Sequence, residues 1–203
     1  MLILGAPMAM AQQITPGVAG GLRLTGDDGF YGWPVPSNSR RYLVGPQVEV
    51  GLPLHLAVAV DALYSRLGRT EYLPFIANEY DLRAIADAWT FPVLLRYRLP
   101  PRLNPFAEFG IAPRHLSGTT HTIHYGYLPS DVTFSSETWS ANDHAWVLGG
   151  GIALHPGRLR IAPEFRYLRW SFPANPPDAA VFYDGAPQNE VQILLGIGWA
   201  VRE

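Results

Sequence analysis

Apolar and polar residues alternate along most of this chain with a period of two residues. The clearest case is residues 189–201, where the odd positions form one apolar face: Val191, Ile193, Leu195, Ile197, Trp199 and Val201. The even positions are mostly polar or small: Glu190, Gln192, Leu194, Gly196, Gly198 and Ala200. Because successive side chains of a strand point to opposite faces, the pattern predicts a β-strand. Its length suits a tilted strand that crosses a bilayer in about 9 to 11 residues.

The same alternation predicts seven more strands. They span residues 17–25, 41–52, 54–65, 86–99, 105–115, 144–155 and 158–170. Each has one apolar face and one face of small or polar residues. No stretch reaches the roughly 18 consecutive apolar residues of a transmembrane helix. The chain is therefore predicted to be all-β.

Long and short connections alternate between these strands. The long ones are rich in Gly, Pro, Ser, Asn and Asp, which favour loops, and they span about 26–40, 66–82, 116–143 and 171–188. Since alternate connections of an antiparallel meander lie at the same end, all four long loops should lie together. The pattern predicts an eight-stranded antiparallel up-and-down β-barrel. The longest loop, 116–143, is expected to be either a surface feature with its own short hairpin or a mobile cap.

The charged residues indicate which face of the barrel points inward. The apolar face carries a charge only at Arg169, near the loop end of its strand, whereas the opposite face is charged in most strands. The charged positions of that opposite face are Arg23, Glu49, Asp61, Arg96, Glu108, Arg114, Arg160, Glu164, Arg166 and Glu190. Such a face suits a narrow lumen in which acids and bases pair. The apolar face would then contact lipid, as in a transmembrane β-barrel; the alternative is a soluble lipocalin-like barrel with an apolar interior.

Aromatic residues on the apolar face favour the membrane barrel. Those near the long connections are Tyr42, Tyr64, Trp89, Trp146 and Tyr167, and those near the short turns are Tyr97 and Trp199. Two such levels are expected of interfacial aromatic girdles. Further aromatics fall in the predicted loops, where they resemble contact residues: Phe30, Tyr31, Trp33, Tyr125, Tyr127 and Trp139.

The composition agrees with a membrane barrel and limits the kinds of partner and site that the chain is expected to have. Charged residues make up 16% of the 203 residues and the net charge is -2, so nucleic acid is not an expected partner. Cysteine is absent, which excludes disulfides and thiolate metal sites. Residues 1–11 are apolar and end in Ala9-Met10-Ala11, like the cleavage end of a secretory signal. The barrel domain is therefore predicted to comprise residues 12–203.

With these features the chain resembles a family, the small porin-like, OmpA/OmpX-type outer-membrane β-barrels of Gram-negative bacteria. The resemblance rests on the signal-like Ala9-Met10-Ala11, on residues 162–170 (APEFRYLRW) and on the closing residues 191–199 (VQILLGIGW). It implies a bacterial outer-membrane location, contact with outer-membrane lipid, and external loops that present a binding surface for a protein or another surface ligand.

Candidate chemistry in the sequence is sparse. Some barrels of this kind modify lipid A with a His, a Ser and an acid. Here His115 and Ser117 share a strand face, but it is the lipid-side face, and Arg169 stands where such a deacylase would place its His. The histidines 115, 121, 124 and 144 are too loosely spaced to predict a metal site. We predict a non-enzymatic membrane scaffold without cofactor or metal, with lipid A modification and soluble ligand binding as alternatives.

Overall fold

The structure, a computed structural model, consists of β-strands throughout the part that it describes: residues 13–25, 39–74, 79–99, 104–126, 131–171, 188–199 and 201. Its strands are β1 (Ile14–Arg23), β2 (Tyr42–Gly51), β3 (Leu56–Asp61), β4 (Leu63–Pro74), β5 (Glu79–Thr90), β6 (Val93–Arg98), β7 (Pro105–Tyr125), β8 (Val132–Ile152), β9 (Leu159–Ser171) and β10 (Asn189–Trp199). Within these residues no helix is long and apolar enough to cross a membrane.

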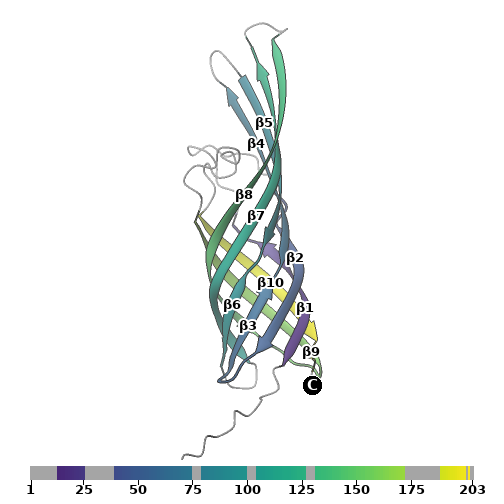
Figure 1. Cartoon of the computed structure of the whole chain (residues 1–203), viewed down its shortest axis with the longest axis vertical. Coiled ribbons are helices and arrows are strands. Elements are labelled where there is room, and N and C mark those ends of the chain that lie inside the picture. The colour runs from purple at the N-terminus through teal and green to yellow at the C-terminus, as the bar shows by residue number, and fades with distance from the viewer. Residues whose placement is uncertain are drawn as a thin grey trace, which may run out of the picture.

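The strands close into a barrel (Figure 1). Its wall has eight strand positions, which we call staves, because two of them are each made of two consecutive strands. Strands β3 and β4 form one stave with a break at Ala62, and β5 and β6 form another with a break at Phe91 and Pro92. Neighbouring strands are antiparallel, and the pairing of β1 with both β2 and β10 closes the ring. The predicted eight-stranded antiparallel up-and-down barrel is confirmed.

The two breaks lie where proline removes a backbone donor from the ladder. The amide of Ala62 donates to the carbonyl of Pro46 at 3.0 Å, and the amide of Asp61 donates to the carbonyl of Pro92 at 3.1 Å. Neither proline can return a hydrogen bond, so the regular ladder stops at these points. The backbones also approach closely here: a Cβ at Gly45 would lie 1.7 Å from the carbonyl oxygen of Ala62. Glycine at position 45 therefore permits the contact between β2 and the β3–β4 stave.

The outer surface of the barrel is apolar on every stave. Exposed side chains on it include Val18, Val48, Val60, Leu95, Phe109, Leu148, Phe165 and Leu195. The alternate positions of the same strands are buried in the lumen. A closed ring leaves no strand edge without a partner and presents only side chains to its surroundings, which is what hydrocarbon requires of a sheet.

Two of the four predicted loops are largely strand. β4 and β5 extend to Pro74 and from Glu79, inside the predicted loop 66–82, and β7 and β8 extend to Tyr125 and from Val132, inside the predicted loop 116–143. The loop prediction was wrong for 66–82, whereas for 116–143 the alternative with a hairpin holds, although the hairpin is long. The extensions of β4, β7 and β8 mix polar residues into both faces, and the alternation in β5 of Leu82, Ala84 and Ala86 with charged residues was missed. Most of loops 26–40 and 171–188, and residues 1–11, lie outside the described residues.

The extensions form a four-stranded sheet that rises beyond the barrel (Figure 1). We call it the projecting sheet, and it comprises residues 66–74, 79–87, 117–125 and 132–140. The last pair between β8 and β9 is His144 with Ser171, so β8 leaves the ring at this level. The lumen-side face of the sheet base holds a buried apolar cluster: Leu67, Ala86, Ala88, Leu116 and Trp139.

Trp139 corrects a second expectation. It was expected among exposed loop aromatics, but only 5% of it is exposed. Its ring lies over Gly118, where a Cβ would come within 2.4 Å of the indole. The indole Nε1 donates to Thr120 Oγ1 at 3.0 Å. Trp139 therefore anchors the base of the projecting sheet. Tyr125 is exposed on the opposite face, and Phe30, Tyr31, Trp33 and Tyr127 lie outside the described residues.

Candidate functional site

Two buried arginines hold an ion network in the barrel lumen. Arg96, on β6, contacts three carboxylates: Glu49 at 2.5 Å, Glu108 at 2.8 Å and Glu164 at 2.8 Å. The side chain of Arg96 is completely buried. Each of its three guanidinium nitrogens therefore has an acidic partner on a different strand. Such charge-assisted hydrogen bonds are the strong kind, and they join β2, β6, β7 and β9 across the lumen.

Arg166, on β9, makes the second centre of the network. It contacts Asp61 at 2.7 Å, Glu108 at 2.8 Å and Glu164 at 2.7 Å. Glu108 and Glu164 thus bridge the two arginines. Glu108 accepts from Arg96 and Arg166 with different oxygens, whereas Glu164 accepts from both with Oε2. Because buried charges require partners, this shared arrangement holds the two carboxylates and both arginines in one geometry.

Two further arginines complete the network toward the short-turn end of the barrel. Arg160 lies 2.9 Å from Glu49, and Arg98 also pairs with Glu49. The ring of Phe106 lies under Arg96 and Arg160, with centroid distances of 4.8 and 5.7 Å. Four arginines thereby face four carboxylates, and their formal charges cancel. In the adjoining turn between β8 and β9, burial together with Arg160 and Arg98 lowers the pKa of His155.

Apolar side chains fill the lumen next to the network on the side of the projecting sheet. Leu63, Leu94 and Leu168 are at most 1% exposed. Each lies two positions from a network residue in that direction, on the staves that carry Asp61, Arg96 and Arg166. The lumen is therefore occupied first by paired charges and then by buried leucines, of which Leu94 and Leu168 belong to one apolar cluster and Leu63 to another. An eight-stranded barrel leaves room for little else.

A second polar group lies nearer the projecting sheet. Arg114 on β7 binds both carboxylate oxygens of Asp143 on β8, at 2.9 and 2.5 Å. Its guanidinium carbon lies 3.7 Å from the ring centroid of Trp170. The Trp170 indole donates to Glu190 at 3.0 Å, and the amide of Gln192 donates to the other oxygen of Glu190 at 2.7 Å. These contacts tie β7, β8, β9 and β10 together at the lumen mouth.

The structure brings most of the predicted lumen charges into one group. Those in the central network are Glu49, Asp61, Arg96, Glu108, Arg160, Glu164 and Arg166. Arg114 belongs to the separate group at the mouth. Arg23 is half-buried near the same end of β1, beside Gln192 in the strand pairing. The sequence therefore identified the lumen face, but it could not divide these charges into two groups.

Sequence reasoning missed several members of these groups. Arg98 has the same inward register as Arg96 and could have been included from the alternation alone. Asp143 was assigned to a loop because the strand was expected to begin one residue later. Trp170 was not assigned to any site from the sequence, although its ring stacks on the guanidinium group of Arg114 in the lumen. Gly149 also serves the network, since a Cβ there would lie 2.9 Å from an oxygen of Glu108.

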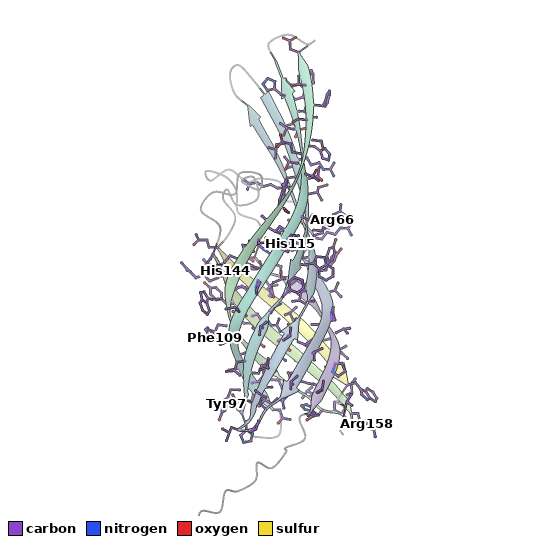
Figure 2. The ribbon with its side chains drawn as sticks, viewed as in Figure 1. Arg66, Tyr97, Phe109, His115, His144 and Arg158 are labelled. Atoms are coloured by element: carbon purple, nitrogen blue, oxygen red, sulfur yellow. The ribbon has the colours of Figure 1, made fainter. Side chains whose placement is uncertain are left out.

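The predicted interfacial aromatics lie on the outer surface at two levels. Near the projecting sheet, Tyr64 and Trp89 are in contact with ring centroids 5.4 Å apart, and Trp146 stacks on Phe109 at 5.7 Å. Tyr42 and Tyr167 are half-buried on the same side. At the opposite end Tyr97 and Trp199 are exposed; Figure 2 shows Tyr97 at that end.

The structure also places the residues of the two chemical alternatives. His115 and Ser117 are exposed on the outer face, and His115 Nδ1 lies 2.8 Å from Asn142 Oδ1, a neutral amide that cannot act as the acid of a triad. Within the described residues no group of three or more His, Asp or Glu side chains could hold a metal ion.

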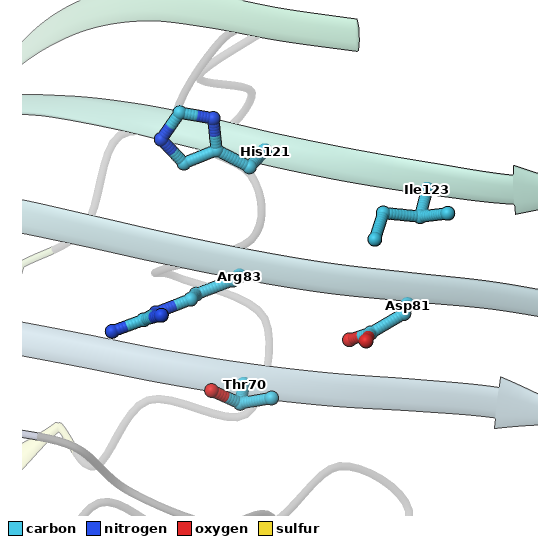
Figure 3. A pocket seen from close by; sticks show the side chains of 5 residues that line it. All are labelled: Thr70, Asp81, Arg83, His121 and Ile123. Carbon is cyan, nitrogen blue, oxygen red and sulfur yellow. The ribbon is translucent and has the colours of Figure 1, made fainter. Parts of the chain in front are cut away.

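A groove on the outer face of the projecting sheet is the second candidate site. It is lined by Thr70, Asp81, Arg83, His121 and Ile123, and its volume is about 580 Å³. Thr70 pairs with Arg83, and Arg83 with His121, so these three side chains form a row across β4, β5 and β7. Asp81 and Ile123 form the next row. Figure 3 shows the five side chains on one side of the three strands.

No protein-family model and no curated protein sequence matches the chain. Solved structures similar to it include a major outer membrane protein from Thermus thermophilus, with a TM-score of 0.52 and 15% identity over 93% of this chain and 99% of that one. Another is Ail, the attachment invasion locus protein of Yersinia pestis, with a TM-score of 0.44 and 11% identity over 95% and 100% of the two chains. Neisserial surface protein A has a TM-score of 0.40 and 10% identity over 93% and 97%. At these identities the likeness concerns the fold, which is that of the small outer-membrane β-barrels.

Proposed function

We propose that this protein is a bacterial outer-membrane scaffold with a closed lumen, and that its projecting sheet is a binding surface outside the cell. The observation that carries the proposal is the continuation of β4, β5, β7 and β8 beyond the last pairing of β8 with β9. A barrel needs no such extension to span a membrane. Rigid strands that hold polar side chains clear of a membrane are suited to presenting a binding surface.

The lumen supports a structural role for the barrel body rather than transport. Arg96 and Arg166 are held by four carboxylates, and leucines pack beside them. A solute would have to separate these buried pairs, and an unpaired buried charge is costly. The lumen therefore acts as an internal brace between strands that are far apart in the sequence.

The two alternative functions fit the geometry less well. A lipid A-modifying enzyme needs a histidine oriented by an acid, whereas His115 has the amide of Asn142 as its partner. A soluble ligand-binding barrel needs an apolar cavity, whereas here paired charges and buried leucines fill the lumen, and the large exposed apolar side chains of the barrel face outward. We therefore propose a binding protein without catalytic activity.

Trimming the projecting sheet tests the binding role. Residues 70–83 and 121–136 are each replaced by Asn-Gly, which joins the directly paired residues Arg69 with Ala84 and Thr120 with Glu137. The Trp139 cluster stays in place, so the trimmed protein is expected to fold, which is checked by comparing its heat-modifiable gel shift with that of the intact protein. The trimmed protein should no longer bind the whole cells, or the cell-surface extracts, that the intact protein binds. Unchanged partners in the trimmed form would place the binding surface elsewhere.

Planar-bilayer recording tests the closed lumen. With Arg96 and Arg166 paired as observed, the reconstituted protein is expected to show no steady single-channel conductance. A porin of known conductance, reconstituted in the same lipid, serves as the positive control. Reproducible channels that disappear in a Gly196→Leu variant, whose side chain would enter the lumen, would instead show an open path for ions.

A further inference from the structure

We infer that the outer face of the projecting sheet binds the saccharide part of glycolipids in the surrounding outer leaflet. This inference rests on the proposed binding role of the sheet and names its ligand. It starts from the groove of Thr70, Asp81, Arg83, His121 and Ile123, the face of which continues the lipid-facing surface of the same strands.

The position of the groove relative to the membrane follows from strand register. Three side-chain rows of this face can be followed upward from the interface. Tyr64, Trp89, His115 and Asn142 make the first, Arg66, Asp87, Ser117 and Ser140 the second, and Gly68, Ile85, Thr119 and Thr138 the third. The row of Thr70, Arg83 and His121 comes next. Strands rise about 3.3 Å per residue, so the groove begins roughly 20 Å along the strand from the aromatic level.

The position of the groove indicates where its ligand comes from. Figure 2 shows Arg66 and His115 at the level where the sheet leaves the barrel. The groove lies above them on the side that, lower down, touches lipid tails. It therefore faces sideways over the neighbouring lipids and not outward from the cell. The molecules that occupy this space are the headgroups of outer-leaflet lipids, and those that extend this far are saccharides.

The charges on this face favour a ligand rich in hydroxyl groups over a simple anion. Arg66 pairs in register with Asp87, and Arg83 lies next to the row of Asp81, so the formal charges of these four residues cancel. A guanidinium offers donors in a planar fork, and a carboxylate accepts from two hydroxyls at once. Together they match the alternating donors and acceptors of a sugar ring. A phosphate alone would meet the acids as well as the bases.

The remaining side chains of the face suit the same ligand. Hydroxyl side chains lie on its neighbouring positions: Thr70, Ser117, Thr119, Ser136, Thr138 and Ser140. At the upper end, Ile123 pairs in register with Phe134, which is 75% exposed. An exposed aromatic ring can stack on the apolar C–H face of a sugar. The groove thus has polar groups along its floor and an apolar side chain at one end.

The test measures the affinity of the full chain, in detergent, for the water-soluble saccharide released from outer-leaflet glycolipid. In the double variant Arg83→Gln/His121→Gln the affinity is expected to fall at least about tenfold, the effect of losing one charge-assisted hydrogen bond. The matched control is Arg158→Gln/His155→Gln, which removes the same side-chain types at the opposite end of the barrel and should bind like the parent. Heat-modifiable gel shifts verify that both variants fold.

The inference is overturned if the parent does not bind the saccharide, or if the groove variant binds as the parent does. An equal loss in the control variant would also overturn it. Inorganic phosphate that displaces the saccharide completely would show a simple anion site instead. If trimming the sheet removes the partners while the groove variant retains its saccharide affinity, the inference fails and the proposed binding role stands. If trimming changes no partner, the binding role itself fails.

Discussion

Replacing Arg166 by methionine is expected to destabilise the folded barrel by about 3 to 5 kcal/mol, the range for breaking a buried ion pair. Arg166 is the ion-pair partner of Asp61, Glu108 and Glu164. Methionine has a similar length and no charge, so the variant keeps most of the volume and leaves the carboxylates without that cation. Glu108 and Glu164 retain Arg96, whereas Asp61 has no other ion pair among the described residues.

The measurement is urea-induced unfolding in lipid vesicles, with Arg169→Met as the control. Arg169 is on the same strand but exposed, and its replacement should change the free energy of unfolding by less than about 0.5 kcal/mol. The double variant Arg166→Met/Asp61→Asn should be more stable than Arg166→Met, because the carboxylate that depends on Arg166 has been neutralised. Equal stability of Arg166→Met and Arg169→Met would show that the network does not brace the barrel.

The facing of the lumen residues could be predicted because a period of two is a local property of the chain. Glu108 and Phe109 face opposite sides whatever the rest of the chain does. Which acid meets which arginine could not be predicted in the same way. Arg166 and Asp61 are 105 positions apart in the sequence, and their contact depends on the stagger of strands around the ring. Alternation within one strand carries no information on that stagger.

The projecting sheet shows where the period-two signal ends. In β7 the residues beyond Leu116 are mainly Ser, Thr, Gly and His on both faces, because this part of the strand needs no apolar contact with lipid. The threonines 119, 120 and 122 favour extended backbone, and this β-propensity was the remaining local signal. It is too weak to separate a solvated hairpin from a loop rich in threonine. The groove of Arg83 and His121 was missed for this reason, since it requires the register of three strands.

Replacing Leu195 by arginine is expected to impair folding into membranes by about 2 to 4 kcal/mol, the cost of a cation at the lipid face near the bilayer midplane. Leu195 lies on the outer face at the middle of β10, paired with Gly20 and Pro163. The upper aromatic level, at Tyr167, is opposite Val191, and the lower level is at Trp199 on the same strand. An arginine at position 195 could reach neither interface easily, so the variant should show most of this loss in the free energy of folding.

Two controls separate the membrane effect from a packing effect. Leu195→Met keeps the volume and the apolar character, and should cost less than about 1.5 kcal/mol. Val201→Arg places the same charge beyond Trp199, outside the apolar belt, where the cost should fall to about 0 to 1 kcal/mol. The free energies are compared by folding titrations into lipid vesicles. If the barrel with this facing were surrounded by water instead of lipid, Leu195 would be solvated, and an arginine there would be as harmless as at position 201. Equal stability of the two arginine variants would therefore contradict the membrane orientation of the whole barrel, because all eight staves share the same facing.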